Sequence, residues 1–185
     1  MAMMFHRLRL INKKQLGFTL VELMIAIAVS GVITGAITTT VYQVVTGNFR
    51  TNNHMTAVRQ VQEAGYWVSH DALMAQSVEL AGESVDDPDG TRFPFTLTWT
   101  EWDTNDVHHV VYSLDGNELQ RIHSINGTTE ASIIIAEFID PEPAKTSCDW
   151  DGGVLTFTVT ATVGAGSAQE QSETRVYEVK PRPGS

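Results

Sequence analysis

A single carboxylate interrupts a stretch of sequence that otherwise has the composition of a membrane segment. Glu22 follows a basic stretch that contains Lys13 and Lys14, and the 27 residues between Glu22 and Arg50 are all uncharged. A carboxylate inside lipid costs about 3 kcal/mol and persists where it has a partner or a function. The chemistry open to Glu22 is therefore ion pairing, since a buried anion and a buried cation each cost less when paired.

Acidic residues in the middle of the chain are the second candidate for chemistry. The run "DDPDG" holds Asp86, Asp87 and Asp89, whose carboxylate oxygens are the ligands that calcium prefers. The run lacks the full set of spaced ligands of a calcium loop. We therefore expect a solvated acidic turn, with these three residues as weak calcium candidates and no metal or cofactor required.

Histidine and cysteine give no site by spacing. His108 and His109 are adjacent on a predicted strand, so they point to opposite faces and do not share a metal. Cys148 is the only cysteine, which excludes an intrachain disulfide, and no spacing pairs it with a base for nucleophilic catalysis. We predict that the chain is not an enzyme.

Two further patterns have simple structural interpretations. Aromatic side chains can stack on a ligand, but packing is the simpler role for Trp99, Trp102 and Trp150. Asn126 begins the glycosylation sequon "NGT", yet Asn-Gly is first of all a turn signal.

The element that carries Glu22 must be a long apolar helix. The stretch after Phe18 contains no proline and is long enough to cross a hydrocarbon layer of about 30 Å. Because basic residues cluster before it, the positive-inside rule places the N-terminus in the cytoplasm and the remainder of the chain outside.

Two ordinary interpretations of this stretch leave Glu22 without a role. The small residues Ala26 to Ala28 can serve as a signal-peptidase site, which would release a secreted enzyme that starts at Val29. Alternatively, the helix is a plain anchor for an extracytoplasmic binding or adhesion module. The apolar run continues well past Ala28, however, and neither interpretation needs an acid.

The periodicity of the sequence then changes twice. From Asn48 to Leu80 apolar residues recur at steps of three and four, which predicts an amphipathic helix that continues the apolar one and stops near Gly82. After an acidic linker, alternation with period two in "RFPFTLTWTEW" and "GGVLTFTVTATVG" predicts strands, with a hairpin at Asp115-Gly116. We expect an α+β fold in which a long N-terminal helix packs on a C-terminal antiparallel sheet.

The charge is distributed unevenly along the chain. The formal net charge is −10, and the first 17 residues contain four basic residues and no acid, so the remainder is close to −14. Such an acidic body repels phosphate backbones, so we predict no nucleic-acid partner.

The stretch "KKQLGFTLVE" resembles the processing signature of type IV prepilins and type II secretion pseudopilins. The shared features are a short basic leader, Gly17, Phe18, and Glu22 as the fifth residue of the mature chain, followed by a long uncharged helix. The resemblance implies cleavage between Gly17 and Phe18 and N-methylation of Phe18 by a prepilin peptidase. It also implies that Glu22 pairs with the Phe18 amine of a neighbouring subunit. Gly31 and Gly35, one turn apart, either pack helices closely, or reflect the ordinary frequency of glycine in membrane helices, or loosen the helix locally.

Later segments resemble the larger J-type minor pseudopilins and related minor pilins. The resemblance places a recurring arginine and aspartate of the helix at Arg59 and Asp71, and a tyrosine-bearing hairpin at Tyr112 and Arg121. The chain departs from the family in lacking a C-terminal disulfide and a helix-kinking proline.

The family resemblance implies a minor structural subunit of a pilus or pseudopilus. Its partners would be the prepilin peptidase, other pilin subunits, the inner-membrane assembly platform and, before assembly, membrane lipid. We expect a single-pass protein of the cytoplasmic membrane that then enters the filament. The expected divisions are a leader (1–17), a filament-core helix (18–46), an amphipathic helix (47–81), an acidic linker (82–91) and a β domain (92–185).

Overall fold

The computed structural model describes residues 17–81 and 92–181, and the chain divides into two units, Met1–Val45 and Thr46–Ser185. Several predicted features lie outside the described residues, namely the leader lysines Lys13 and Lys14 and the linker 82–91 with Asp86, Asp87 and Asp89.

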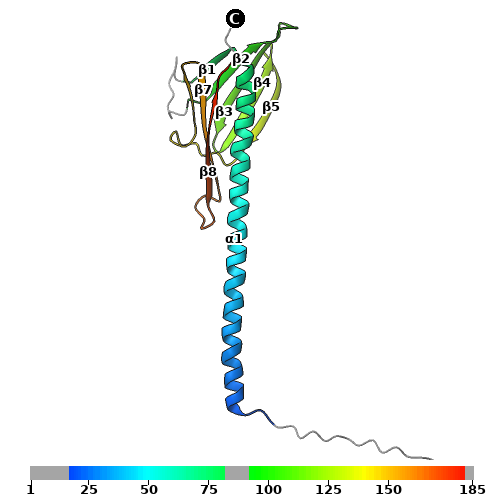
Figure 1. Ribbon diagram of the computed structural model, residues 1–185. Helices are drawn as coiled ribbons and strands as arrows, with labels where there is room; N and C mark the ends of the chain where they lie inside the picture. The colour runs from blue at the N-terminus through cyan, green and yellow to red at the C-terminus, as the bar shows by residue number, and fades with distance from the viewer. Residues whose placement is uncertain (1–16, 82–91, 182–185) are drawn as a thin grey trace, which may run out of the picture. The chain divides into compact units, whose positions relative to one another are not determined.

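One long helix followed by antiparallel strands confirms the predicted α+β class (Figure 1). The helix α1 spans Leu20–Met74. The strands are β1 (Ser77–Leu80), β2 (Phe95–Thr100), β3 (Val107–Asp115), β4 (Glu118–Ile125), β5 (Thr128–Ala136), β6 (Ser147–Asp151), β7 (Val154–Val163) and β8 (Gln171–Val179).

The described part of the N-terminal unit is almost entirely helical and wholly exposed. Every residue from Gly17 to Val45 is exposed, including large apolar side chains such as Leu20, Ile25 and Ile33. Apolar surface of this extent is unfavourable in water. The α1 segment is long and apolar enough to cross a membrane.

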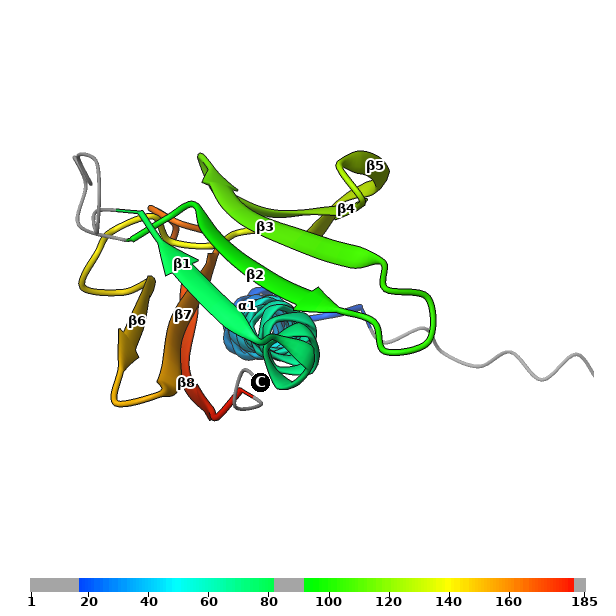
Figure 2. The ribbon, with the colours of Figure 1, turned by 90° about the horizontal axis from the view of Figure 1, so that it is seen from above.

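In the C-terminal unit, α1 buries one face against two sheets. The buried positions recur at steps of three and four, as the sequence predicts, and are Ala57, Val61, Ala64, Val68 and Ala72. Figure 2 shows this part of α1 in the angle between β1–β5 on one side and β6–β8 on the other. The core therefore has a single helical component that contacts both sheets.

The strands form two sheets, whereas the sequence pattern predicts one. The strands β1 to β5 pair in chain order as a five-stranded antiparallel meander, and β6, β7 and β8 form a separate three-stranded sheet. The predicted alternation of buried and exposed residues is confirmed in both sheets. Phe95 and Leu97 of β2 are fully buried, and so are Leu155 and Phe157 of β7. Period-two patterning fixes which face is buried, but it does not say which strands are neighbours.

The prediction that the helix extends to Leu80 is wrong. The α1 helix ends at Met74, and Ser77–Leu80 forms the edge strand β1, whose Leu80 pairs with Phe95 of β2. As a strand, this segment directs both Val78 and Leu80 toward the core, whereas in a helix residues two apart point to different sides. Pairing with β2 therefore overrides the helical pattern.

The predicted hairpin turns are confirmed. β3 ends at Asp115 and β4 begins at Glu118, with Gly116 at a φ of 59°. The next turn uses Asn126 and Gly127, with φ values of 50° and 81°, which is the backbone that favours an Asn-Gly pair in a two-residue hairpin.

Candidate functional site

The predicted processing residues lie at the start of α1. Phe18 is 90% exposed, Thr19 immediately precedes the first helical residue, and Glu22 lies in the first turn. The Glu22 carboxylate accepts hydrogen bonds through Oε2 from the backbone N–H of Thr19 at 3.2 Å and from its hydroxyl at 3.1 Å. In return, the Glu22 N–H donates to Thr19 Oγ1 at 3.2 Å.

These reciprocal bonds form a capping box, in which an N-cap hydroxyl and a glutamate three residues later satisfy each other's backbone donors. Glu22 thus has a role within its own chain: it helps to start the helix. This role was not predicted, although the pattern Thr-x-x-Glu before an apolar run is a recognisable signal for it. Any test of Glu22 must therefore separate the effect of its charge from its role in capping the helix.

Threonine hydroxyls in the N-terminal unit bond to the helix itself. Thr34 donates to the Ser30 carbonyl at 2.8 Å and Thr39 to the Gly35 carbonyl at 2.9 Å, and Thr38 and Thr40 repeat this i−4 pattern. Such bonds satisfy hydroxyls where no water is present, and they slightly weaken and bend the helix.

The predicted packing glycines have open surroundings. A Cβ built at Gly31 or Gly35 would meet no atom within 4 Å. Both glycines therefore present bare helix surface, and their roles in close packing or helix loosening remain predictions.

A second cluster, the Asp71 triad, consists of Asp71, Tyr112 and Arg121. The Tyr112 hydroxyl and the Arg121 Nε each donate to Asp71 Oδ2 at 2.6 Å, and Arg121 Nη2 donates to Oδ1 at 3.2 Å. All three residues are buried, and the Arg121 guanidinium also lies 4.9 Å from the centre of the Trp67 ring. The triad joins α1 to β3 and β4.

The triad is electrostatically satisfied, so its expected role is structural. Burial, with the Asp71 charge, raises the pKa of Tyr112 far above its ordinary value, which keeps the phenol protonated as a donor. Burial alone would lower the pKa of Arg121, but the hydrogen bond and charge of Asp71 outweigh it and raise that pKa. A charge network whose members are mutually bonded holds elements in register.

The family resemblance selected four residues, of which Asp71, Tyr112 and Arg121 form this cluster and Arg59 does not. Arg59 lies on the outer side of α1, where its side chain is 79% exposed and contacts Glu63 at 3.7 Å. An exposed pair of this kind contributes at most about 0.5 kcal/mol.

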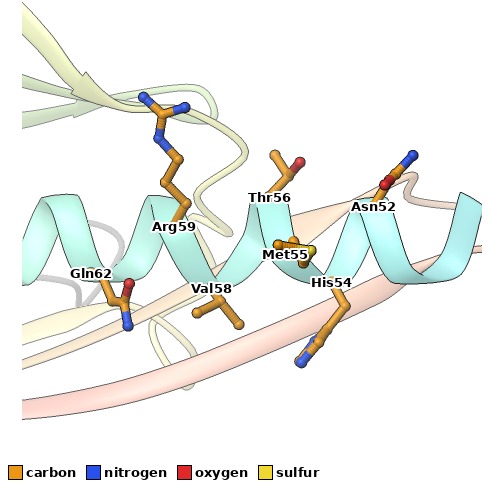
Figure 3. Close-up of a pocket in the computed structure, with 7 residues that line it drawn as sticks. All are labelled: Asn52, His54, Met55, Thr56, Val58, Arg59 and Gln62. Atoms are coloured by element: carbon orange, nitrogen blue, oxygen red, sulfur yellow. The ribbon is translucent and has the colours of Figure 1, made fainter.

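The outer side of α1 around Arg59 forms a shallow depression without convergent groups. Its lining residues all belong to the helix and are Asn52, His54, Met55, Thr56, Val58, Arg59 and Gln62. In Figure 3, Arg59 and Gln62 point to opposite sides of the helix. The depression is an open helix surface, and its residues do not converge on a ligand.

The remaining candidates give no catalytic centre among residues 17–81 and 92–181. Cys148 is buried, and burial, with the Asp149 charge, raises the pKa of its thiol, which makes it inert. No group of three or more metal-ligating side chains occurs in the described parts. Asn126 holds the turn, because its Nδ2 donates to Asp106 Oδ1 at 2.7 Å and its Oδ1 accepts from the Val107 N–H at 2.9 Å.

The histidines and tryptophans lie partly where predicted. His109 contacts Thr98, while His108, on the other face of β3, meets His123 of β4 at 3.0 Å. Trp99 and Trp150 pack against the core as predicted, but the packing role predicted for Trp102 is wrong, because Trp102 lies in the turn after β2 and is 92% exposed. The pairing of His108 with His123 was not predicted, because it depends on the register between two strands.

Comparison with known proteins identifies the N-terminal segment. Residues 12–38 match the family model for the prokaryotic N-terminal methylation motif, a range that includes Gly17, Phe18 and Glu22. No match to the chain was found among curated proteins or among solved structures. The match covers 27 of the 185 residues: the N-terminal segment is similar to a methylation motif of the prepilin type, and an exposed apolar helix that is long enough to cross a membrane begins within it.

Proposed function

We propose that this chain is a minor subunit of a type IV pilus or type II secretion pseudopilus. Its role is structural rather than catalytic. The observation that carries the proposal is the junction at Phe18, where the methylation motif runs into a helix whose apolar side chains are all exposed as far as Val45. A surface of this kind needs lipid before assembly and neighbouring helices afterwards.

The proposed subunit has five parts. A basic leader (1–17) is removed, and the helix that follows (18–46) enters the filament core. The helix then continues as an amphipathic part from residue 47, and an acidic linker (82–91) leads to the β domain (92–185). The β domain faces outward from the cytoplasmic membrane, where it selects neighbouring subunits or an external target. Lys13 and Lys14 hold the leader on the cytoplasmic side.

Processing is the first step that can be tested. We expect mass spectrometry of the mature protein from cells with a prepilin peptidase to show a chain that begins at N-methylated Phe18. A Gly17→Val variant should retain its leader, because the side chain obstructs the cleaved bond, while Gly31→Val should be processed like the parent. An intact leader would favour the anchored binding module, and a start at Val29 would favour the secreted enzyme; either result contradicts the proposal.

Assembly is the second step, and it assigns Glu22 a role between subunits. The new Phe18 amine is a cation at the start of an apolar helix, and Glu22 of a staggered neighbour supplies its partner. Both capping bonds of Glu22 use Oε2, so Oε1 can accept from that amine. Pairing of this kind specifies the register between helices whose apolar packing is otherwise unspecific. Gly31 and Gly35 allow the same helices to approach closely.

Two substitutions separate pairing from capping. Glu22→Gln keeps a side-chain oxygen for the capping box but loses the charge, while Thr19→Val loses the hydroxyl and keeps the charge. We expect Glu22→Gln to enter filaments at least about tenfold less than the parent, because a charge-assisted hydrogen bond contributes about 1.5–3 kcal/mol. Thr19→Val should enter nearly as well as the parent.

The measurement is the fraction of each variant in sheared filaments, relative to its total in cells that supply the other subunits. Processing of each variant is checked first by the mass of its N-terminus. If Thr19→Val and Glu22→Gln lose incorporation equally, Glu22 acts through the helix cap and the pairing role is wrong.

The minor and J-type assignment rests on the resemblance of the later segments. The Asp71 triad joins residues that the resemblance selected on α1, β3 and β4, which supports a common architecture. The peptidase, other pilin subunits and the assembly platform are the partners this proposal requires.

A further inference from the structure

The two histidines of the five-stranded sheet share a single hydrogen bond. His108 Nδ1 and His123 Nε2 are 3.0 Å apart, and the two ring planes differ by 15°. The ring centres are 5.2 Å apart, so the centres are farther apart than the two bonded nitrogens. The two nitrogens therefore lie between the ring centres, and the rings meet edge to edge. Only one proton fits between the two facing nitrogens.

This geometry suits a proton and is too short for a metal ion held in line between the two rings. A metal ion held in line between two imidazole nitrogens requires about 4 Å between them, because each bond is about 2.0–2.1 Å long. The observed separation is a full ångström shorter. The histidine pair is therefore a hydrogen-bonded unit whose state depends on its protonation.

The outer nitrogen of His108 has an acceptor in reach. His108 Nε2 is buried and makes no hydrogen bond, and Glu101 Oε2 lies 3.6 Å from it. The ring of Trp99 lies nearly parallel to that of His108, with centres 5.0 Å apart. A proton on Nε2 would face a carboxylate on one side and an aromatic ring on the other, and both stabilise a cation.

His123 has the opposite surroundings. Burial, the Arg121 charge and the neighbouring His108 lower the pKa of His123 below its ordinary 6.5, against smaller contributions from Asp71 and Glu130. A second proton on the pair would also leave two N–H groups facing each other without an acceptor. The pair therefore resists a second proton, on His123.

The first proton acts on the β2–β3 loop, residues 101–106. Glu101 Oε2 now accepts from the Thr104 hydroxyl at 3.2 Å, and the Glu101 backbone closes the loop through bonds to Asn105 and Asp106. Hydrogen bonds from Thr104 and Asn126 lower the pKa of Asp106, so it remains a fixed negative charge next to His108. A change at Glu101 therefore reaches the loop that exposes Trp102.

We propose that His108, His123 and Glu101 form a pH-sensitive latch for the β2–β3 loop. One proton on His108 converts its 3.6 Å contact with Glu101 into an ion pair and draws Glu101 away from Thr104. A second proton, on His123, breaks the bond between the histidines. The latch goes beyond the proposed assembly role and does not depend on it.

The direction of the effect on stability follows from His123. Because its pKa is lower in the folded chain than in the unfolded chain, the unfolded chain binds more protons as the pH falls. The contribution of a neutral His123 to the free energy of unfolding is therefore fully present above pH 6.5 and is lost progressively below that pH.

The test is an NMR titration of the full-length protein in detergent micelles, with ¹⁵N-labelled histidine, from pH 8 to pH 4. We expect the His108 ring to become doubly protonated before the His123 ring as the pH falls. The backbone amides of Thr104 and Asn105 should shift together with the His108 transition. If both rings titrate together, or the loop amides do not follow His108, the latch is wrong.

Two substitutions in the same loop provide the matched comparison. Glu101→Gln should abolish the shift of the Thr104 amide with the His108 transition, whereas Asp103→Asn removes an equal charge and should leave it in place. The spectator His109, on the opposite face of β3, should keep the same backbone amide shift in both variants, which reports that the sheet is intact. Equal effects of the two substitutions would mean that only net charge matters and would overturn the latch.

Discussion

An Asp71→Asn variant is expected to lose about 3–5 kcal/mol of unfolding free energy in the C-terminal unit. The substitution keeps the shape of the side chain but leaves the buried Arg121 guanidinium without its counter-ion, which is among the costliest single changes in a core. An amide NH₂ would also confront Arg121 or Tyr112, both of which are donors. Chemical unfolding of the full-length protein in micelles, followed by near-ultraviolet circular dichroism, measures the loss.

Three comparison variants make this result specific to the Asp71 triad. Tyr112→Phe removes one hydrogen bond to a charged group and should cost about 1.5–3 kcal/mol. Arg59→Gln removes an exposed charge from the same helix and should cost less than about 0.5 kcal/mol. Asp71→Leu combined with Arg121→Met should recover much of the loss, because no unpaired charge then remains. An Asp71→Asn protein as stable as Arg59→Gln would contradict the structural role.

Local patterns in the sequence predicted the elements well. The face of α1 that carries Val61 and Val68 and the alternating faces of β2 and β7 are fixed by periodicity, because each element buries one side. Glu22 could also be singled out, since a charge in an apolar run requires an explanation wherever it occurs, while cleavage between Gly17 and Phe18 stays a prediction.

Contacts between distant segments could not be predicted in this way. The end of α1 at Met74 depends on pairing between β1 and β2, and the His108–His123 bond depends on the register of β3 against β4. The resemblance selected Asp71, but its distances to partners 41 and 50 residues away required the structure. Periodicity says which face is buried and does not name what covers it.

Gly65 is a single residue whose contact with a distant segment could not be predicted from the sequence. In the sequence it is a glycine inside a helical pattern, which by itself costs up to about 1 kcal/mol relative to alanine. In the structure the Tyr177 ring of β8 lies directly against its Cα, and the Tyr177 hydroxyl donates to the Val61 carbonyl at 3.0 Å. The glycine is therefore the place where the three-stranded sheet approaches the helix.

A Gly65→Ala variant is expected to lose about 1–3 kcal/mol of unfolding free energy, although alanine is the better helix former. The added Cβ would overlap ring carbons Cζ and Cε2 of Tyr177, so the ring must move and give up its bond to Val61. Overpacking costs about 1–3 kcal/mol and the lost hydrogen bond about 1 kcal/mol, against a helical gain of up to about 1 kcal/mol. Chemical unfolding in micelles measures the difference.

Gly47→Ala is the matched control, because Gly47 lies on the same helix and its added Cβ would meet nothing within 4 Å. That variant should be unchanged or up to about 1 kcal/mol more stable. In a Tyr177→Ala background the clash is absent, so Gly65→Ala should also become neutral or stabilising. If Gly65→Ala remains equally costly without the ring, the close approach of Tyr177 is not the reason for the glycine, and an effect on the helix backbone must be sought instead.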